Sequence, residues 1–204
     1  IDFTIGRAIV NASVVMFPNA PQIVADAQLA DTRYGEVVIQ SSRAKVNYTG
    51  GRGTAPAVLT GSSSNPFNIA LNAQLAPNNY LVAAKGQANG INFRTANPAR
   101  IQNAKGEWQV TPTRIDFGRG SVLVAGSYGN GLKVQTRLDK LQLSILDAFV
   151  PNLGISGEAS GALDFAQARD ASFPAAEARL TIGQQIAVED GDLIGITPLD
   201  INLR

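Results

Sequence analysis

The sequence contains no cysteine and no histidine among its 204 residues. Without cysteine the chain can form no disulfide, no thiol nucleophile and no thiolate metal site. Without histidine it lacks the commonest general base and the commonest metal ligand. Any catalysis would have to rely on carboxylates, lysine, tyrosine or serine, and no motif arranges these groups for a reaction. We therefore expect that the protein is not an enzyme and holds no cofactor and no metal.

The sequence also lacks an excess of either charge and any long apolar run. It has 17 lysine and arginine residues and 16 aspartate and glutamate residues, for a net charge of +1. The basic residues are scattered singly, which predicts neither a nucleic-acid partner nor attraction to an anionic membrane surface. No run approaches the roughly 18 apolar residues of a transmembrane helix, so any membrane anchor would lie outside this sequence.

The dominant feature that is present is alternation of apolar and polar residues with a period of two. In residues 66–77 one side carries Phe67, Ile69, Leu71 and Leu75, and the other side carries mainly asparagine and glutamine. Similar runs recur along the chain and are separated by short turns of asparagine, glycine and proline. This pattern predicts an all-β fold, a meander of a dozen or more antiparallel strands with one apolar and one hydrophilic face.

One segment departs from the alternation. The spacing of the apolar residues in LSILDAFVPN predicts a short helix over 142–151, with Ser144 as its N-cap and Pro151 at its end. We expect this helix to cover apolar surface of the sheet. No linker, charge block or low-complexity tract divides the chain, so residues 1–204 are predicted to form a single section of one continuous sheet.

Glycine occurs repeatedly on the apolar face of the predicted strands, most densely in GISGEASGALDF, residues 154–165. Glycine inside a strand contributes no side-chain packing and costs conformational entropy. Small residues could let a curled sheet bend or let neighbouring strands approach closely. Alternatively, they could leave room for an apolar molecule from outside. The inward glycines expected here are Gly86, Gly126, Gly157 and Gly161.

Residues 138–167 and 173–182 resemble the C-terminal region of TamB-like proteins, within the wider AsmA-like group. The shared features are a leucine-rich short helix that ends near a proline, a glycine-spaced strand, and a proline that leads into an alternating strand. In this sequence they fall at 141–151, 154–165 and 174–182. Both ends of the sequence lie in strand register, so we expect an excerpt of a longer protein.

The resemblance implies a fold, a location and a function. It implies a long curled sheet, a U-shaped β-taco whose open groove has an apolar lumen. It also implies a periplasmic protein, anchored in the inner membrane by a segment absent from this sequence. Such a protein would partner a TamA-like outer-membrane barrel and conduct phospholipid acyl chains towards the outer membrane. Two alternatives are a chaperone that assists insertion of outer-membrane proteins by β-augmentation, and a passive β-solenoid or adhesin section.

We expect the large apolar residues of the inner face to line the groove. The same residues could instead pack against one another across a closed sandwich. The candidate lipid-groove residues are Phe67, Ile69, Leu71, Val82, Phe93, Trp108, Ile115, Phe117, Val134, Leu163, Phe165 and Leu180.

Overall fold

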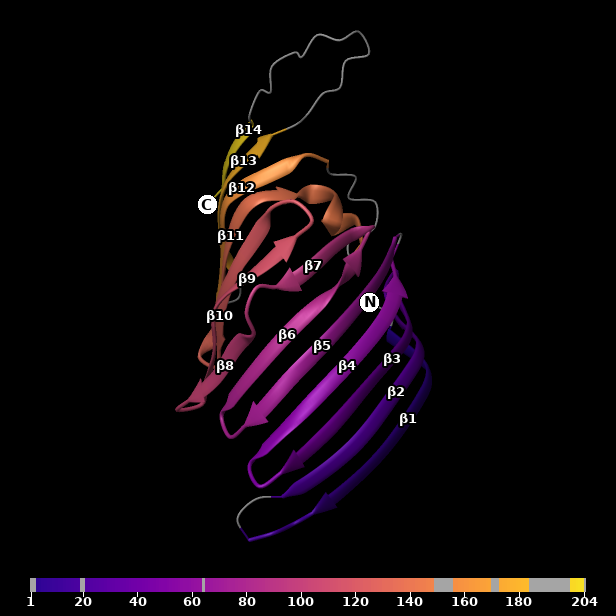
Figure 1. The fold of residues 1–204 in the computed structure, drawn as a ribbon. Coiled ribbons are helices and arrows are strands. Elements are labelled where there is room, and N and C mark those ends of the chain that lie inside the picture. Colours follow the sequence, from indigo (N-terminus) through magenta and orange to yellow (C-terminus); the bar gives the residue numbers. More distant parts are fainter. Residues whose placement is uncertain are drawn as a thin grey trace.

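A computed structural model describes residues 3–18, 21–63, 65–148, 156–169, 173–183 and 199–203. In this part of the chain, fourteen strands form one antiparallel sheet with a single short 3₁₀ helix (Figure 1). The elements are β1 (Phe3–Val15), β2 (Gln22–Tyr34), β3 (Val37–Thr49), β4 (Arg52–Ser62), β5 (Pro66–Ala76), β6 (Asn79–Ala88), β7 (Ile91–Thr95), β8 (Ala99–Ala104), β9 (Glu107–Phe117), β10 (Ser121–Tyr128), β11 (Gly131–Gln142), η1 (Leu143–Ala148), β12 (Glu158–Ala168), β13 (Ala175–Gly183) and β14 (Leu199–Leu203).

Strands that follow one another in sequence are neighbours in the sheet, as a meander requires. The exception is the pair β7 and β8, which lie end to end between β6 and β9 and each pair with one half of both. Asn97 and Pro98 separate the two short strands, because proline cannot donate to the ladder. The predicted all-β antiparallel meander is thereby confirmed.

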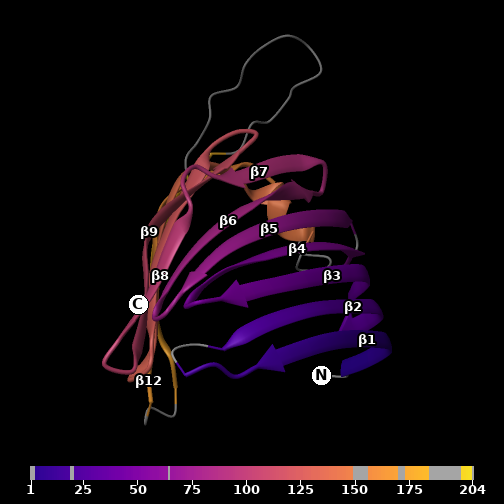
Figure 2. The same ribbon diagram turned by 60° about the horizontal axis from the view of Figure 1, so that its bottom comes forward.

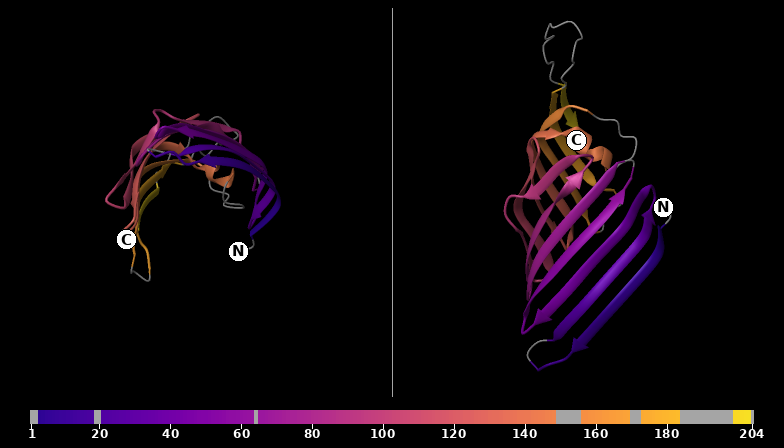
Figure 3. Two further views of the ribbon diagram at one scale, coloured as in Figure 1. Left: turned by 90° about the horizontal axis from the view of Figure 1, so that it is seen from below. Right: turned by 45° about the vertical axis from the view of Figure 1, so that its right-hand side comes forward.

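The sheet is strongly curled. Seen from below, it forms an arch whose first and last strands lie on opposite limbs, with an opening between them (Figure 3). Cross-strand pairing defines two faces, because directly paired residues point to the same side. We call the side that carries Phe67, Ile69 and Leu71 the concave face, since η1 packs against it inside the arch. The opposite side, which carries Asn68 and Asn72, is the convex face.

A small buried cluster lies at one end of the concave face. Phe67, Ala88, Val122 and Leu141 form it together with Ile145 of η1, which is only 3% exposed. The side-chain amide of Asn89 also donates a hydrogen bond of 2.8 Å to the Ser144 carbonyl. The expectation that this segment covers apolar sheet surface is therefore confirmed.

The details of the helix differ from the prediction. The helix is 3₁₀ and begins at Leu143, so Ser144 lies inside it and the N-cap assignment is wrong. No cap is needed there, because β11 runs directly into the helix and the Leu143 amide donates to the Gly157 carbonyl at 2.9 Å. The predicted stop at Pro151 lies outside the described residues.

The glycines of the concave face permit close contact between strands. A Cβ on Gly86 would overlap the Asn68 carbonyl of β5, and one on Gly126 would lie 2.7 Å from the Lys133 carbonyl of β11. Gly161 adopts φ of +137°, and a Cβ there would overlap the Arg179 carbonyl of β13. Glycine here serves the packing and bending of the sheet, which favours the first of the two interpretations of these residues.

Gly157 does not occupy the position that the sequence predicted. It lies in a bend with φ of +103°, just before β12 begins at Glu158, and its carbonyl accepts the Leu143 amide. The prediction that Gly157 faces inward from a strand is therefore wrong. Gly154, at the start of the same motif, lies outside the described residues.

Candidate functional site on the concave face

All twelve residues predicted to line the groove lie on the concave face. The strand register shows this directly: Ile69 of β5 is paired with Gly86, Gly86 with Phe93, and Phe93 with Phe117. On the other limb Val134 of β11 is paired with Phe165, and Gly161 with Leu180. The alternation in the sequence thus identified the correct face on seven different strands.

The register places no charged residue of the described strands on the concave face outside the strand bulges. The polar residues there are mainly hydroxyl groups, such as Ser42, Thr113 and Thr136. Thr32 is buried at 4% exposure, and its hydroxyl has no hydrogen-bond partner among the described residues. The face is therefore an apolar surface of large extent with few polar interruptions.

The side chains of the described residues do not fill the concave face. Leu163 is 41% exposed, Leu132 38%, Val14 58% and Val10 64%, and no large side chain among the described residues is fully buried. In a closed sandwich these inward residues would belong to the buried core. The exposures contradict the closed-sandwich alternative and leave most of the apolar face accessible.

Not every predicted lining residue is accessible. Phe67 is 6% exposed and belongs to the cluster beneath η1, and Phe93 and Phe117 pack against that cluster with their ring centroids 6.1 Å apart. These three phenylalanines therefore serve mainly as core at the η1 end of the face. The sequence pattern could not distinguish them from accessible positions, because their covering depends on η1 from a distant part of the chain.

Aromatic residues with a polar group gather at the other end of the face. Tyr80 and Trp108 stack with centroids 5.4 Å apart and an interplanar angle of 19°. Tyr128, paired with Trp108, is 65% exposed, and Tyr48 of β3 lies three strands from Tyr80 of β6, at the same end of the sheet. We call these four residues the aromatic row. Of these four residues, only Trp108 was predicted to line the groove. Tyr128 lies two residues after Gly126 in β10 and therefore on the same face, so the alternation alone could have identified it.

The inward residues of β1 and β2, such as Val10, Val14 and Leu29, were also missed. The signal was weak because β1 carries exposed apolar residues on both faces, including Ile9 at 46% on the convex side. A strict alternation was therefore absent from its sequence. These residues extend the apolar surface across the limb of the arch that carries the first strands.

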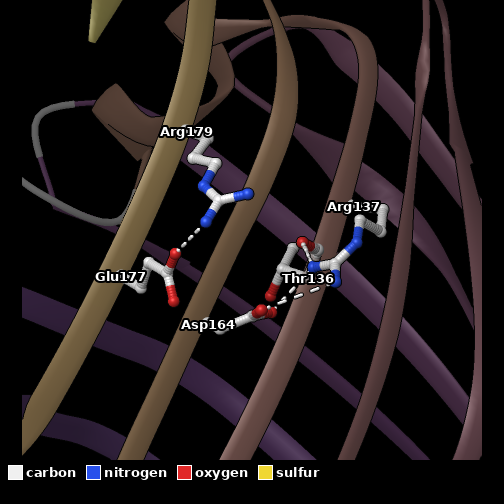
Figure 4. A network of polar contacts seen from close by, with 5 residues as sticks. All are labelled: Thr136, Arg137, Asp164, Glu177 and Arg179. Atoms are coloured by element: carbon white, nitrogen blue, oxygen red, sulfur yellow. Dashed lines mark hydrogen bonds and ion pairs between the residues drawn. The ribbon is translucent and has the colours of Figure 1, made fainter. Parts of the chain in front are cut away.

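The convex face carries the charged residues of the strands, several of them paired across neighbouring strands (Figure 4). Arg137 of β11 donates to both carboxylate oxygens of Asp164 of β12, at 2.7 and 3.4 Å. This contact holds the pKa of Asp164 below its ordinary value, and Arg43 lowers the pKa of Asp26 in the same way. The pairs are solvent-exposed, so they favour solubility and register more than they add stability.

The convex face also has shallow troughs between its side chains. A trough of about 840 Å³ on the C-terminal limb is lined by polar residues such as Gln109, Lys133 and Asp164, and also by Pro112, Val134 and Phe165. The described residues include no group of three or more acidic side chains placed to hold a metal ion. No helix in this part of the chain is long and apolar enough to span a membrane.

No family model, no curated protein and no solved structure matches the chain. The fold and the site therefore rest on the molecule's own geometry: a curled antiparallel sheet with an apolar, largely uncovered concave face.

Proposed function

We propose that this chain is a periplasmic section of a TamB-like protein that conducts phospholipid acyl chains along its concave face, towards the outer membrane. The observation that carries the proposal is that, among the described residues, this face is apolar, carries no charge outside the strand bulges, and is covered only at the η1 end. Soluble proteins rarely expose large contiguous apolar surfaces unless these bind something.

The energetics of an acyl chain suit such a surface. A chain of about 15 methylenes gains roughly 12 kcal/mol when it leaves water for an apolar environment, at about 0.8 kcal/mol per methylene. It loses nearly the same amount when it leaves a bilayer, so the two terms almost cancel. A tail could therefore pass from a membrane to the concave face and move along it without being trapped.

The shape of the sheet suits the polar part of a phospholipid. The arch is open between its two limbs (Figure 3), so a headgroup could remain in water while the tail contacts the inner surface. A charge on the concave face would interrupt the path, because an unpaired charge in an apolar environment is costly. The absence of strand charges from this face is what continuous movement of a tail requires.

A second candidate function is a chaperone for outer-membrane proteins that pairs with their strands. Within the described residues β1 forms one edge of the sheet, spans thirteen residues and has exposed side chains at every position whose burial is described. A long edge strand with apolar residues is a template for β-augmentation. The partnership with a TamA-like barrel is likewise a proposal, drawn from the resemblance.

Two leucines of equal exposure provide the test. Leu163 lies on the concave face and Leu123 on the convex face, and each is 41% exposed. We expect Leu163→Asp to weaken binding of a fluorescent phospholipid by about tenfold or more, because the carboxylate lies in the path of the tail. Leu123→Asp should leave binding unchanged. Equal affinity of the two variants, with circular dichroism showing both folded, would refute conduction along the concave face.

A further inference from the structure

One end of the sheet differs in character from the other. In a meander, alternate turns fall at the same end, so the turns β1–β2, β3–β4, β5–β6, β8–β9, β10–β11 and β12–β13 share one end. Figure 2 shows the ends of β8 and β12 on the side towards which β1 points. This is the end that carries the aromatic row, and we call it the aromatic end. The opposite end carries η1 and the buried phenylalanine cluster.

The most exposed large apolar side chains of the described residues lie at the aromatic end. Phe173 is 84% exposed, Met16 is 76% exposed and Tyr128 is 65% exposed. Phe17, beside Met16, is 52% exposed. Met16 and Phe17 follow β1 and Phe173 precedes β13, so the apolar tips come from the two opposite limbs of the arch. Large apolar residues that are this exposed on a protein surface mark a candidate interaction surface.

Each residue of the aromatic row lies within two residues of a turn at this end. Tyrosine and tryptophan are enriched where an apolar region meets water, because their rings are apolar and their O–H or N–H groups are polar. The stacked pair of Tyr80 and Trp108 and the exposed Tyr128 provide this chemistry at the aromatic end. The residues thus follow the order found at a bilayer surface, with apolar groups outermost and amphipathic rings behind them.

The charges of the turns differ between the two ends. Among the described residues, Lys105 and Arg169 lie in turns of the aromatic end, and Arg52 and Glu107 begin the strands that follow two of its turns. At the opposite end, Glu36 and Arg119 lie in turns and Glu158 begins β12, so this end has no basic excess among the described residues. These basic residues are far apart in sequence, which is why the scattered charges did not predict such a surface. A basic excess complements anionic phospholipid headgroups.

We propose that the aromatic end docks onto the surface of an anionic phospholipid bilayer. Met16, Phe17 and Phe173 insert below the headgroups, the aromatic row lies at the headgroup level, and the basic turn residues contact lipid phosphates. Docking in this way brings the rim of the concave face against the bilayer. The inference goes beyond conduction of acyl chains and does not depend on it, because it concerns attachment to a surface.

The test is flotation of the 204-residue chain with vesicles of phosphatidylcholine and phosphatidylglycerol. We expect Phe17→Asp and Phe173→Asp each to lower the vesicle partition coefficient by about tenfold or more, since each replaces an inserted ring by a charge. Tyr34→Asp is the matched control, because Tyr34 is 55% exposed and is the last residue of β2, at the opposite end of the sheet. It should bind vesicles as the unaltered chain does.

The single tryptophan of the chain provides a second readout. If the aromatic end docks, Trp108 emission shifts to shorter wavelength with vesicles and is quenched by brominated acyl chains.

The proposal is overturned if the unaltered chain does not float, or if Tyr34→Asp loses as much binding as Phe173→Asp. A further result would also overturn it: sedimentation could show that Met16, Phe17 and Phe173 join two copies of the chain, with vesicles binding neither the single chain nor the pair. If the chain does not bind vesicles but still binds phospholipid molecules, docking is refuted and conduction is not. If it binds vesicles but no phospholipid molecules on its concave face, conduction is refuted and docking is not.

Discussion

Arg137 and Asp164 face each other from neighbouring strands on the convex face, and their contact makes a prediction that titration can check. The arginine hydrogen bonds lower the pKa of Asp164, with a smaller contribution from the nearby charge of Arg179. Since the folded pKa lies below the unfolded value of about 3.9, the pair stabilises the fold above that pH. This stabilisation is lost as the pH falls through the lowered folded pKa.

We therefore expect Arg137→Gln to raise the pKa of Asp164 towards its ordinary value, because the variant removes both the hydrogen bonds and the charge. Carboxyl chemical shifts followed by NMR across the acid range measure this directly. Asp26, which has its own partner in Arg43, serves as an internal control and should titrate unchanged. An Asp164 titration that is identical in the variant would mean that the pair does not form in solution.

At the scale of the single residue, alternation in the sequence predicted which face a side chain occupies but not how deeply it is buried. Phe67 and Leu163 both follow the same parity rule, yet one is 6% exposed and the other 41%. The difference arises from η1, which covers only one end of the concave face. Periodicity reports the direction of a side chain within its strand, and it contains no information on which distant segment lies above it.

At the scale of the element, η1 is the segment that turns part of an open sheet into a core. Among the η1 side chains whose burial is described, Ile145 is the most deeply buried, at 3% exposure, and it packs with Phe67, Ala88, Val122 and Leu141. A helix of six residues has little intrinsic stability. Its position is therefore held by this packing and by the Asn89 hydrogen bond to the Ser144 carbonyl.

We expect Ile145→Ala to lower the free energy of unfolding by about 2–4 kcal/mol, because it removes a buried side chain and leaves a cavity. Denaturant unfolding followed by circular dichroism measures the loss. Leu163→Ala is the control and should cost less than half as much, since Leu163 is already 41% exposed. If the two substitutions cost the same, η1 does not cover the sheet in solution.

The sequence predicted the existence of the elements better than their details. An antiparallel meander of a dozen or more strands, several of its turns and the presence of one short helix were predicted from apolar spacing and from glycine, asparagine and proline positions. The strand that was expected to include Gly157 begins only at Glu158, because the Gly157 carbonyl is used to hold Leu143. The sharing of one strand position by β7 and β8 was also not predictable, since it depends on pairing with β6 and β9.

At the scale of the whole molecule, the chain is a single curled sheet with far more surface than a compact protein. Its accessible surface is 13704 Å², whereas a compact monomer of 21.4 kDa exposes roughly 9100 Å². Much of the apolar face is accessible for this reason. Composition alone did not predict this excess, because the apolar fraction of 45% is ordinary for a globular protein.

The measurement that tests the account most directly is photo-crosslinking to phospholipid from matched positions on the two faces. Val10 and Val134 carry the probe on the concave face, and Val58 and Leu123 carry it on the convex face. The account predicts phospholipid adducts at Val10 and Val134 and few or none at Val58 and Leu123. Adducts of equal yield on both faces, or adducts only to unfolded outer-membrane polypeptide, would contradict it.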